Sequence, residues 1–148
     1  MIHEEQLFRM RFPASAYELM NIRSIVLHTM NDLGCSVDDI HQSIIAVNEA
    51  CSNVIRHAYK DDPGGEIIVE IAKQNHELLF RITDFADYVD PSKIKSRDIS
   101  QLKPGGLGVY IIYQIMDDVR YKHRSDGIGN ILEMRKHVHY TEKIKETV

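Results

Sequence analysis

A stretch near the middle of the chain carries most of the information about this protein: Asn48-Glu49-Ala50-Cys51-Ser52-Asn53-Val54-Ile55-Arg56-His57-Ala58-Tyr59. Between Ile40 and Ala58, apolar residues recur at the spacing of one helix face. They are Ile40, Ile44, Val47, Cys51, Val54, Ile55 and Ala58. At about 100° per residue, Glu49, Asn53 and His57 fall together on the opposite side. The pattern predicts a helix that runs from Ser36 to about Tyr59, with an apolar back and a polar row in front.

The bulk composition indicates one soluble domain. The chain has 148 residues, of which 43% are hydrophobic and 27% are charged, as in ordinary globular proteins. The net charge is −4 and the pI is about 6.0, without the basic footprint typical of nucleic-acid binding. No apolar run approaches the roughly 20 residues that span a bilayer. The first residues also lack an export signal. We therefore expect a cytoplasmic protein without a direct nucleic-acid or membrane partner.

The cysteines and histidines predict neither a disulfide framework nor a structural metal site. The only cysteines are Cys35 and Cys51, and Cys51 lies in the apolar stripe, so both are expected to be reduced thiols. The eight histidines are scattered and form no HExxH motif or Cys/His cluster, which argues against structural zinc.

The order of the expected elements predicts the fold class. They are a strand over 5–12, a helix from Ser15 to Gly34, the long helix, strands over 66–72 and 77–83, a helix from Gly105 to Asp117 or Asp118, and strands over 119–124 and 129–138. The aperiodic stretch 85–104 is expected to be a lid or a disordered insert. We predict an α+β fold, a two-layer α/β sandwich with helices on one face of a mixed, mostly antiparallel sheet. It forms one domain over 1–148, with a core at about 5–138 and a charged tail at 139–148 that is expected to be frayed or loosely helical from Tyr140.

The polar row on the long helix is the first candidate site. A carboxylate such as Glu49 can accept a proton, and the amide oxygen of Asn53, one turn later, suits a hard cation such as Mg²⁺. The alternative is a solvated helix face, since charged residues commonly lie opposite an apolar stripe. The spacing leaves both interpretations open.

Two more places have the residues for nucleotide chemistry. Asp84 ends a strand, where a carboxylate can accept a hydrogen bond from the amine of adenine or can simply cap the following loop. Gly105, Gly106 and Gly108 precede a helix whose free N–H groups suit an anion, and Lys103 lies just upstream. The alternative for the glycines is a helix entry that needs them for its turn.

Taken in order, these features resemble the Bergerat-fold ATP-binding domains that histidine kinases and gyrase share. The resemblance is closest to the small anti-sigma-factor serine/threonine kinases of bacteria. The matching segments are Ala46 to Tyr59 for the N box, Asp84-Phe85-Ala86-Asp87 for the first glycine box, Pro104-Gly105-Gly106-Leu107-Gly108 for the second, and Gly129-Asn130-Ile131-Leu132-Glu133-Met134 for the closing strand. The resemblance spans nearly the whole chain, from about Leu7 to His137.

The resemblance implies a role for each matching residue. Glu49 would be the general base, Asn53 the Mg²⁺ ligand, and Asp84 the acceptor for the adenine amine, with the phosphates beneath a lid over 88–103. The ATP-binding set that it implies is Asn53, His57, Asp84, Ala86, Lys103, Gly105, Gly106, Leu107, Gly108 and Asn130. Two positions depart from the family, which commonly has Gly at Ala86 and Thr at Asn130.

The implied function is phosphoryl transfer from ATP, with Mg²⁺, to a Ser or Thr of a STAS-type anti-sigma-factor antagonist. The implied partners are that antagonist, a sigma factor and a second copy of the chain. One alternative is a regulatory binding module of the same fold without kinase activity, which the changes at Ala86 and Asn130 favour. Another is a detached histidine-kinase catalytic domain, which is disfavoured because no phosphoacceptor helix pair precedes the fold.

Overall fold

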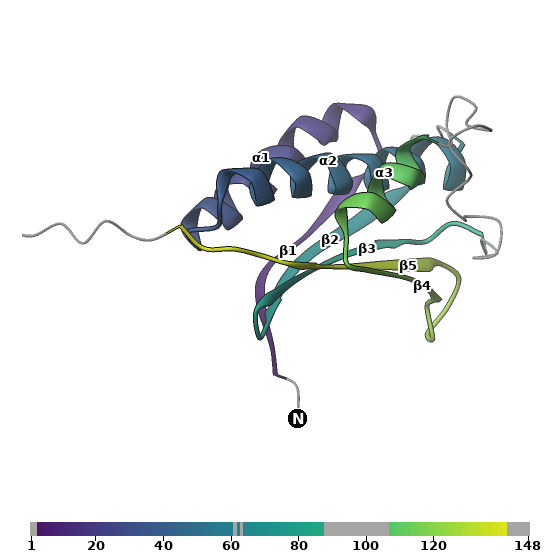
Figure 1. The fold of residues 1–148 in the computed structure, drawn as a ribbon. Helices are drawn as coiled ribbons and strands as arrows, with labels where there is room; N and C mark the ends of the chain where they lie inside the picture. The colour runs from purple at the N-terminus through teal and green to yellow at the C-terminus, as the bar shows by residue number, and fades with distance from the viewer. Residues whose placement is uncertain (1–2, 61, 63, 88–106, 142–148) are drawn as a thin grey trace, which may run out of the picture.

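The structure is a computed structural model that describes residues 3–60, 62, 64–87 and 107–141. Five strands form one sheet, and the helices cover one of its faces (Figure 1). The strand order is β1-β2-β3-β5-β4, and each neighbouring pair runs antiparallel. The predicted α+β two-layer sandwich is therefore confirmed. The sheet is fully antiparallel over the described strands, in line with the predicted mostly antiparallel sheet.

The elements lie within a few residues of their predicted positions. The strands are β1 (Glu4–Pro13), β2 (Glu66–Gln74), β3 (Glu77–Asp84), β4 (Asp118–His123) and β5 (Asn130–His137). The helices are α1 (Leu19–Asp32), α2 (Val37–Asn53) and α3 (Leu107–Ile115), with a 3₁₀ turn at Ala16–Glu18 and a π-helical turn at Val54–Ala58. The strand β1 lies at one edge of the sheet.

The helix caps agree with the sequence signals except at the start of α1. The hydroxyl of Ser36 accepts the N–H of Asp39 at 3.2 Å and begins α2, and Gly34 ends the preceding turn with φ +79°. The hydroxyl of Ser15 accepts a hydrogen bond from the N–H of Tyr17 rather than from that of Glu18. The N–H of Glu18 instead donates to the backbone carbonyl of Ser15 at 3.0 Å. This i→i+3 bond makes the first turn 3₁₀ instead of α-helical.

The end of the long helix differs from the prediction. The sequence predicted α-helix to about Tyr59, but α2 stops at Asn53 and the next turn is π-helical. The N–H of Tyr59 bonds the carbonyl of Val54, five residues earlier, at 3.0 Å. A π turn winds through fewer degrees per residue than an α turn, so later side chains leave the predicted face. His57 is consequently exposed, whereas Tyr59 is half-buried.

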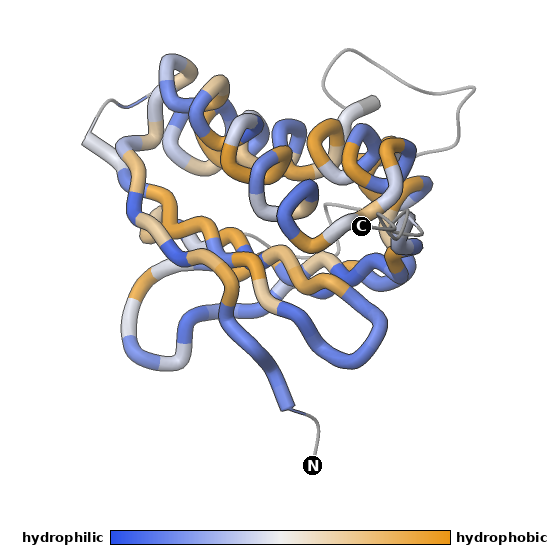
Figure 2. The backbone as a smooth tube through the Cα atoms, turned by 90° about the vertical axis from the view of Figure 1, so that its left-hand side faces the viewer, coloured by the Kyte–Doolittle hydropathy of each residue, from blue (hydrophilic) through white to orange (hydrophobic). Residues whose placement is uncertain are grey.

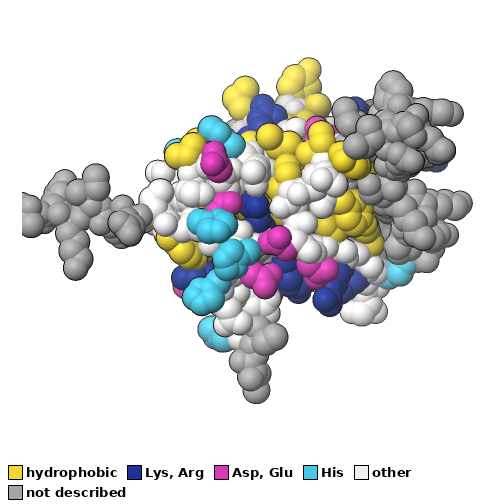
Figure 3. Space-filling model, viewed as in Figure 1, with side chains coloured by type: hydrophobic (Ala, Val, Ile, Leu, Met, Phe, Trp, Pro, Cys, Tyr) yellow, Lys and Arg dark blue, Asp and Glu magenta, His cyan; other side chains and the backbone are white. Residues whose placement is uncertain are grey.

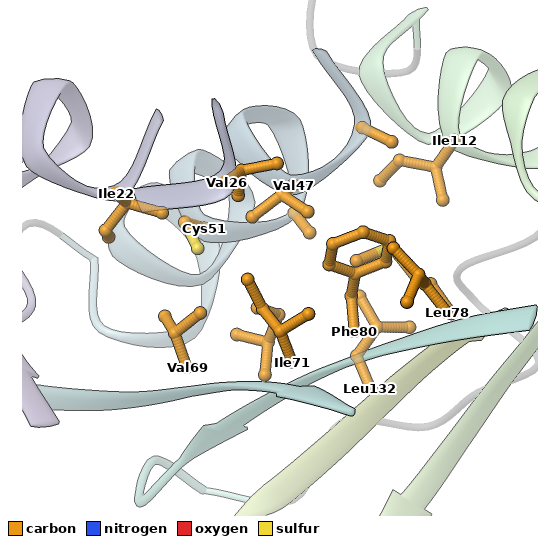
Figure 4. Close-up of a cluster of buried hydrophobic side chains, with 14 of the residues drawn as sticks. Ile22, Val26, Val47, Cys51, Val69, Ile71, Leu78, Phe80, Ile112 and Leu132 are labelled. Carbon is orange, nitrogen blue, oxygen red and sulfur yellow. The ribbon is translucent and has the colours of Figure 1, made fainter. Parts of the chain in front are cut away.

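The core lies between the helices and the sheet. Apolar residues line the facing sides of the two layers (Figure 2). Figure 4 shows side chains from both layers meeting, among them Ile22, Val26, Val47, Cys51, Ile112, Val69, Ile71, Phe80 and Leu132. Both cysteines are buried and free. Because the apolar stripe of α2 faces the sheet, its polar row is turned towards α3.

The other face of the sheet carries a row of alternating charges that crosses all five strands. Glu70 pairs with Arg9 at 3.4 Å and with Arg81 at 3.6 Å. Glu133 pairs with Arg81 at 2.8 Å and with Lys122, although its side chain is only 4% exposed. Burial alone would raise the pKa of Glu133, but the hydrogen bonds from Lys122 and Arg81 bring it below its ordinary value of 4.5.

The chain after β5 packs against the turn between α1 and α2. Tyr140 forms a bridge with Cys35, and the N–H of Thr141 bonds the carbonyl of Gly34 at 2.8 Å. The N–H of His139 donates to Oδ2 of the buried Asp39 at 2.6 Å. The expectation that the tail frays from Tyr140 is thus wrong for Tyr140 and Thr141, and residues 142–148 lie outside the described part of the chain.

Candidate functional site

The polar row of α2 meets the first turn of α3. Glu49 and Asn53 lie one helical turn apart, and both are half-buried. A Cβ atom added to Gly108 would overlap Oε2 of Glu49 and would lie 3.8 Å from Nδ2 of Asn53. Two segments nearly 60 residues apart in sequence are therefore in contact, with only a glycine hydrogen between them. This excludes the solvated helix face as the setting of Glu49 and Asn53.

The amide of Asn53 has unused hydrogen-bonding capacity. Its Nδ2 is buried and has no hydrogen-bond partner among the residues that the structure describes. Native proteins satisfy nearly all buried polar groups, and an exception often marks a place where a ligand binds. An amide presents both a donor, which suits a phosphate oxygen, and an acceptor, which suits a cation. The residues at this point therefore fit a magnesium–nucleotide complex.

His57 does not join Glu49 and Asn53. Its side chain is exposed and forms no hydrogen bond or ion pair with the rest of the described chain. The π turn explains the difference, because the predicted alignment of Glu49, Asn53 and His57 assumed α-helical winding throughout.

Asp84 lies at the end of β3, beside the first residue of β5. Its Oδ1 accepts hydrogen bonds from Nδ2 of Asn130 and from the N–H of Ala86, each at 3.0 Å. Burial raises the pKa of the Asp84 carboxyl above its ordinary value, although both of these donors work in the opposite direction. Asp84 and Asn130 are cross-strand partners, so the structure brings together the two residues implied to recognise the base.

Ala86 is buried, and its backbone takes part in holding the carboxylate. Gly129, just before β5, has φ +145°, and a Cβ there would overlap the carbonyl oxygen of Asp84. A residue with a side chain would therefore push the two strands apart at this position. The close approach keeps Asn130 within reach of Asp84.

Tyr59 connects the N-box helix to this strand end, a role that the sequence interpretation missed. Its hydroxyl donates to the carbonyl of Glu66 at 2.6 Å and accepts the N–H of Phe85 at 2.7 Å. Burial raises the pKa of Tyr59. Tyr59 was part of the quoted N-box stretch, but only the π turn brings its hydroxyl to β3.

The guanidinium groups of Arg11 and Arg124 lie 5.1 Å and 4.5 Å from the centre of the Phe85 ring. Neither arginine was a sequence candidate. The turn after β3 is therefore held from β1 and from the β4–β5 hairpin as well as by Tyr59.

Several predicted site residues lie outside the described part of the chain. They are Lys103, Gly105 and Gly106, together with the expected lid over 88–103. Leu107 begins α3, but only its backbone is described. Gly108 is thus the one residue of the second glycine box whose surroundings are known.

The described residues contain no group of three or more His, Cys, Asp or Glu that could hold a metal ion. In the same residues, no helix is both long and apolar enough to cross a membrane. A cation bound beside Asn53 would need further ligands from the nucleotide phosphates or from water, as Mg²⁺ commonly has.

The separate groups lie at one end of the molecule. The end of α2, the end of β3, the start of β5 and the first turn of α3 share the same side of the sandwich (Figure 1). A base held at Asp84 and phosphates near Gly108 and Asn53 would occupy the two sides of this end.

Comparisons with known proteins agree with this arrangement. The family model described as histidine kinase-like ATPase domain matches residues 12–136. Proteins named serine-protein kinase RsbW, from Bacillus cereus (strain AH820) and Bacillus anthracis, are 33% identical to the chain over 131 residues. These matches cover 83% of this chain and 81% of each relative.

Solved structures share the fold at low sequence identity. The RsbU and RsbW domains of a Mycobacterium tuberculosis protein align with a TM-score of 0.65 and 14% identity, over 90% of this chain and 32% of that one. A chain of the SiaB–SiaC complex from Pseudomonas aeruginosa aligns with a TM-score of 0.64 and 14% identity, over 91% and 90% of the two chains. The resemblance inferred from the motifs is confirmed: the chain belongs to the family of histidine kinase-like ATPase domains, as a relative of the RsbW serine-protein kinases.

Proposed function

We propose that this protein is an ATP-dependent serine/threonine protein kinase whose acceptor is a STAS-type anti-sigma-factor antagonist. The observation that carries the proposal is the contact of Glu49 and Asn53 with Gly108 at the start of α3. It places a carboxylate and an unpaired amide beside a helix N-terminus, where phosphate groups bind favourably. The names of the sequence relatives support the same reaction.

Each described residue has a defined task in this proposal. Asp84, held by Asn130, accepts the hydrogen bond from the adenine amine. Asn53 would hold Mg²⁺ through its amide oxygen, and Gly108 would leave the first turn of α3 open to the phosphates. Bound Mg²⁺ would neutralise charge on the phosphate oxygens. Lys103, Gly105 and Gly106 belong to the phosphate site on the strength of their motif alone.

Glu49 is the proposed general base. It accepts the proton of the acceptor hydroxyl as the hydroxyl oxygen forms a bond to the γ-phosphorus and ADP leaves. Its half-buried position beside Gly108 holds the carboxylate close to the proposed phosphate site. Positioning of the two reactants contributes most of the acceleration in such a site.

The proposed partners are the antagonist, a sigma factor and a second copy of the chain, in a cytoplasmic setting. The fold neighbour SiaB was solved in complex with SiaC, which supports protein binding by this fold. Large apolar side chains are exposed in the 3₁₀ turn and the first turn of α1, including Tyr17 (91%) and Met20 (69%). Figure 3 shows apolar side chains at the surface above this layer. Such side chains are common in protein interfaces.

A regulatory binding module without kinase activity is the second candidate function. The buried methyl group of Ala86, at a position where the family commonly has Gly, favours it. In that case the protein would bind its partner without catalysis, and any nucleotide would have a structural role only or would be absent. Glu49 would then take no part in a reaction.

A thermal-shift titration with Mg²⁺-ATP, Mg²⁺-GTP and Mg²⁺ alone tests nucleotide binding, because a ligand of the folded state raises the unfolding temperature. Transfer of the γ-phosphoryl group to STAS-type proteins of the source organism tests the kinase. We expect Glu49→Gln to retain the ATP-dependent shift and to lose transfer. Equal transfer by this variant would exclude the general-base role, and ATP binding without any transfer would favour the binding module.

A further inference from the structure

A buried lysine of β5 contacts both helices that carry the proposed phosphate site. The side chain of Lys136 is only 9% exposed. Its ammonium lies 3.6 Å from Oδ1 of Asp39, in the first turn of α2. The same ammonium donates a hydrogen bond of 3.4 Å to the carbonyl of Ile115, the last residue of α3. One charged group therefore joins the sheet, the start of α2 and the end of α3.

The charges at this point suit the two helix ends. The first turn of a helix favours an acidic side chain and the last turn favours a cation, because of the unpaired backbone groups there. Asp39 supplies the acid for α2. The last turn of α3, Ile112-Tyr113-Gln114-Ile115, has no basic residue of its own, so Lys136 supplies the cation from the sheet.

The chain directly after α3 is bound to the same part of β5. The N–H of Asp117 donates to the carbonyl of Arg135 at 2.9 Å, and Oδ2 of Asp117 accepts the N–H of His137 at 2.6 Å. These two bonds fix the end of α3 to the sheet on either side of Lys136. The Lys136 ammonium then fixes the same end to α2.

The other end of α3 makes the contact on which the proposed reaction depends, because Gly108 packs against Glu49 there. The helix has nine residues, lies beside α2 (Figure 1) and is about 13 Å long. Such a short helix moves as a stiff unit, so a shift of its last turn relative to α2 also displaces its first turn.

We propose that Lys136 is a positioning residue for phosphoryl transfer: it holds the end of α3 against the start of α2 and so sets how closely Gly108 approaches Glu49. The inference rests on the proposed kinase function and adds a residue that contacts neither the nucleotide nor the acceptor. Lys136 pairs with Leu78, at the opposite end of β3 from Asp84. Its role therefore concerns alignment for transfer more than binding of the base.

The test compares Lys136→Met, which removes the ammonium and keeps most of the aliphatic stem, with Arg81→Met as the matched control. Arg81 pairs with the buried Glu133 on the helix-free face of the sheet, so its loss also leaves a buried carboxylate with one cation fewer. Asp39→Asn is a milder second variant, because the asparagine oxygen still accepts from the ammonium and no unpaired carboxylate remains.

Three measurements are made on each variant. Urea unfolding gives the free energy of unfolding, and a transfer assay gives kcat and KM for Mg²⁺-ATP. Nuclear Overhauser effects between the Hα protons of Gly108 and the side chain of Glu49 report the contact itself in nucleotide-free protein.

We expect Lys136→Met and Arg81→Met both to lower the free energy of unfolding. Lys136→Met alone should lower kcat, by about tenfold, which is part of the roughly 100-fold that a misplacement of 1 Å costs. KM for Mg²⁺-ATP should change less than kcat, and Asp39→Asn should lower kcat by a smaller factor. The Overhauser effect between Gly108 and Glu49 should weaken in Lys136→Met and persist in Arg81→Met.

Unchanged kcat and an unchanged Overhauser effect in Lys136→Met would overturn the inference. Equal losses of kcat in Lys136→Met and Arg81→Met would also overturn it, because they would show that stability alone limits activity. If Lys136→Met does not fold, the same criteria apply to Asp39→Asn. If wild-type protein transfers no phosphoryl group, the proposed function fails, and the Overhauser comparison alone then decides whether Lys136 sets the contact.

Discussion

Gly108 is the residue of α3 that contacts Glu49 and Asn53 of α2. An added methyl group would overlap the carboxylate of Glu49, which is the mobile end of a flexible side chain. The carboxylate can therefore move aside without a change in the backbone. We therefore expect glycine at this position to matter for the proposed reaction rather than for the fold.

We expect Gly108→Ala to leave the free energy of unfolding equal or slightly higher, since alanine is the better helix former. Phosphoryl transfer should fall about 100-fold, because a general base displaced by about 1 Å loses its alignment. Urea unfolding and a transfer assay measure the two effects. Gly64→Ala, in the turn before β2, tests for a general effect of removing a glycine, because Gly64 has no positive φ and an added Cβ would make only an ordinary contact with Asp62. A similar loss of transfer in this variant would contradict the prediction.

Asp84 has a cost in stability as well as its proposed role in binding the base. Its folded-state pKa is raised, so the folded protein binds a proton at this carboxyl more readily than the unfolded chain does. Protonation of Asp84 therefore contributes fully to the free energy of unfolding when the pH is below the ordinary pKa of 3.8. This contribution is lost as the pH rises through the folded-state pKa.

Asp84→Asn should accordingly stabilise the protein near neutral pH, and the difference from wild type should vanish in acid. The asparagine oxygen can still accept from Asn130 and Ala86, while its amide presents donors to the base. We expect weaker ATP binding and a shift of preference towards GTP. Unfolding temperatures between pH about 4 and 8 and nucleotide titrations check both parts. A variant that still prefers ATP would remove Asp84 from base recognition.

At the scale of elements, the π-helical turn at Val54–Ala58 determines which side chains reach the site. The α-helical part of the stretch keeps Glu49 and Asn53 on one face, as the spacing predicted. Beyond Asn53 the wider winding leaves His57 in solvent and brings Tyr59 to the ends of β2 and β3. Extra turns of this kind inside helices are often found at functional sites.

Tyr59→Phe tests the connection between this turn and the strand ends. Loss of the hydroxyl leaves the carbonyl of Glu66 and the N–H of Phe85 without this partner, at a cost of about 1–3 kcal/mol. The affinity for ATP should also fall, because Phe85 directly follows Asp84. Urea unfolding gives the free energy, and Tyr17→Phe is the matched control, since Tyr17 is 91% exposed and should tolerate the change. Equal stability of the Tyr59 variant and this control would show that the hydroxyl has no structural role.

At the scale of the whole molecule, two buried carboxylates form ion pairs and hydrogen bonds that connect elements distant in sequence. Glu133 joins β5 to β3 and β4 through Arg81 and Lys122. Asp39 joins α2 to β5 through Lys136 and to the chain after β5 through His139. Burial alone would raise the pKa of Asp39, but the His139 backbone hydrogen bond, the other donors and the Lys136 charge lower it below 3.8.

These two carboxylates predict a loss of stability in acid. Because each folded-state pKa is lowered, the stabilisation is present above the ordinary values of 4.5 for Glu133 and 3.8 for Asp39. It disappears as the pH falls through the folded-state values. The free energy of unfolding of Glu133→Gln should be lower than that of wild type at neutral pH and should depend less on pH below about 4.5. An identical pH dependence of variant and wild type would contradict this assignment.

Sequence patterns predicted the layers and nearly all element positions because these follow from local rules. Ser36 caps and begins α2, Gly34 ends the helix before it, and apolar runs form the central strands. The candidate site residues were chosen by their motifs. The spacing along the long helix alone was also compatible with Glu49 and Asn53 lying on a solvent-exposed face. The turn to a π-helix was not predictable, because it depends on which carbonyl the N–H of Tyr59 reaches once the helix end is packed.

The sequence by itself determined that this chain forms a sheet covered by helices, and which face of α2 is apolar. Hydrophobic periodicity specifies both within single elements. Only the tertiary structure decided that Gly108 touches Glu49, that Tyr59 replaces His57 at the end of the helix, and that Asn130 holds both Asp84 and Asp87. Those contacts join segments far apart in the chain, so they depend on strand register and packing between layers, which no local pattern records.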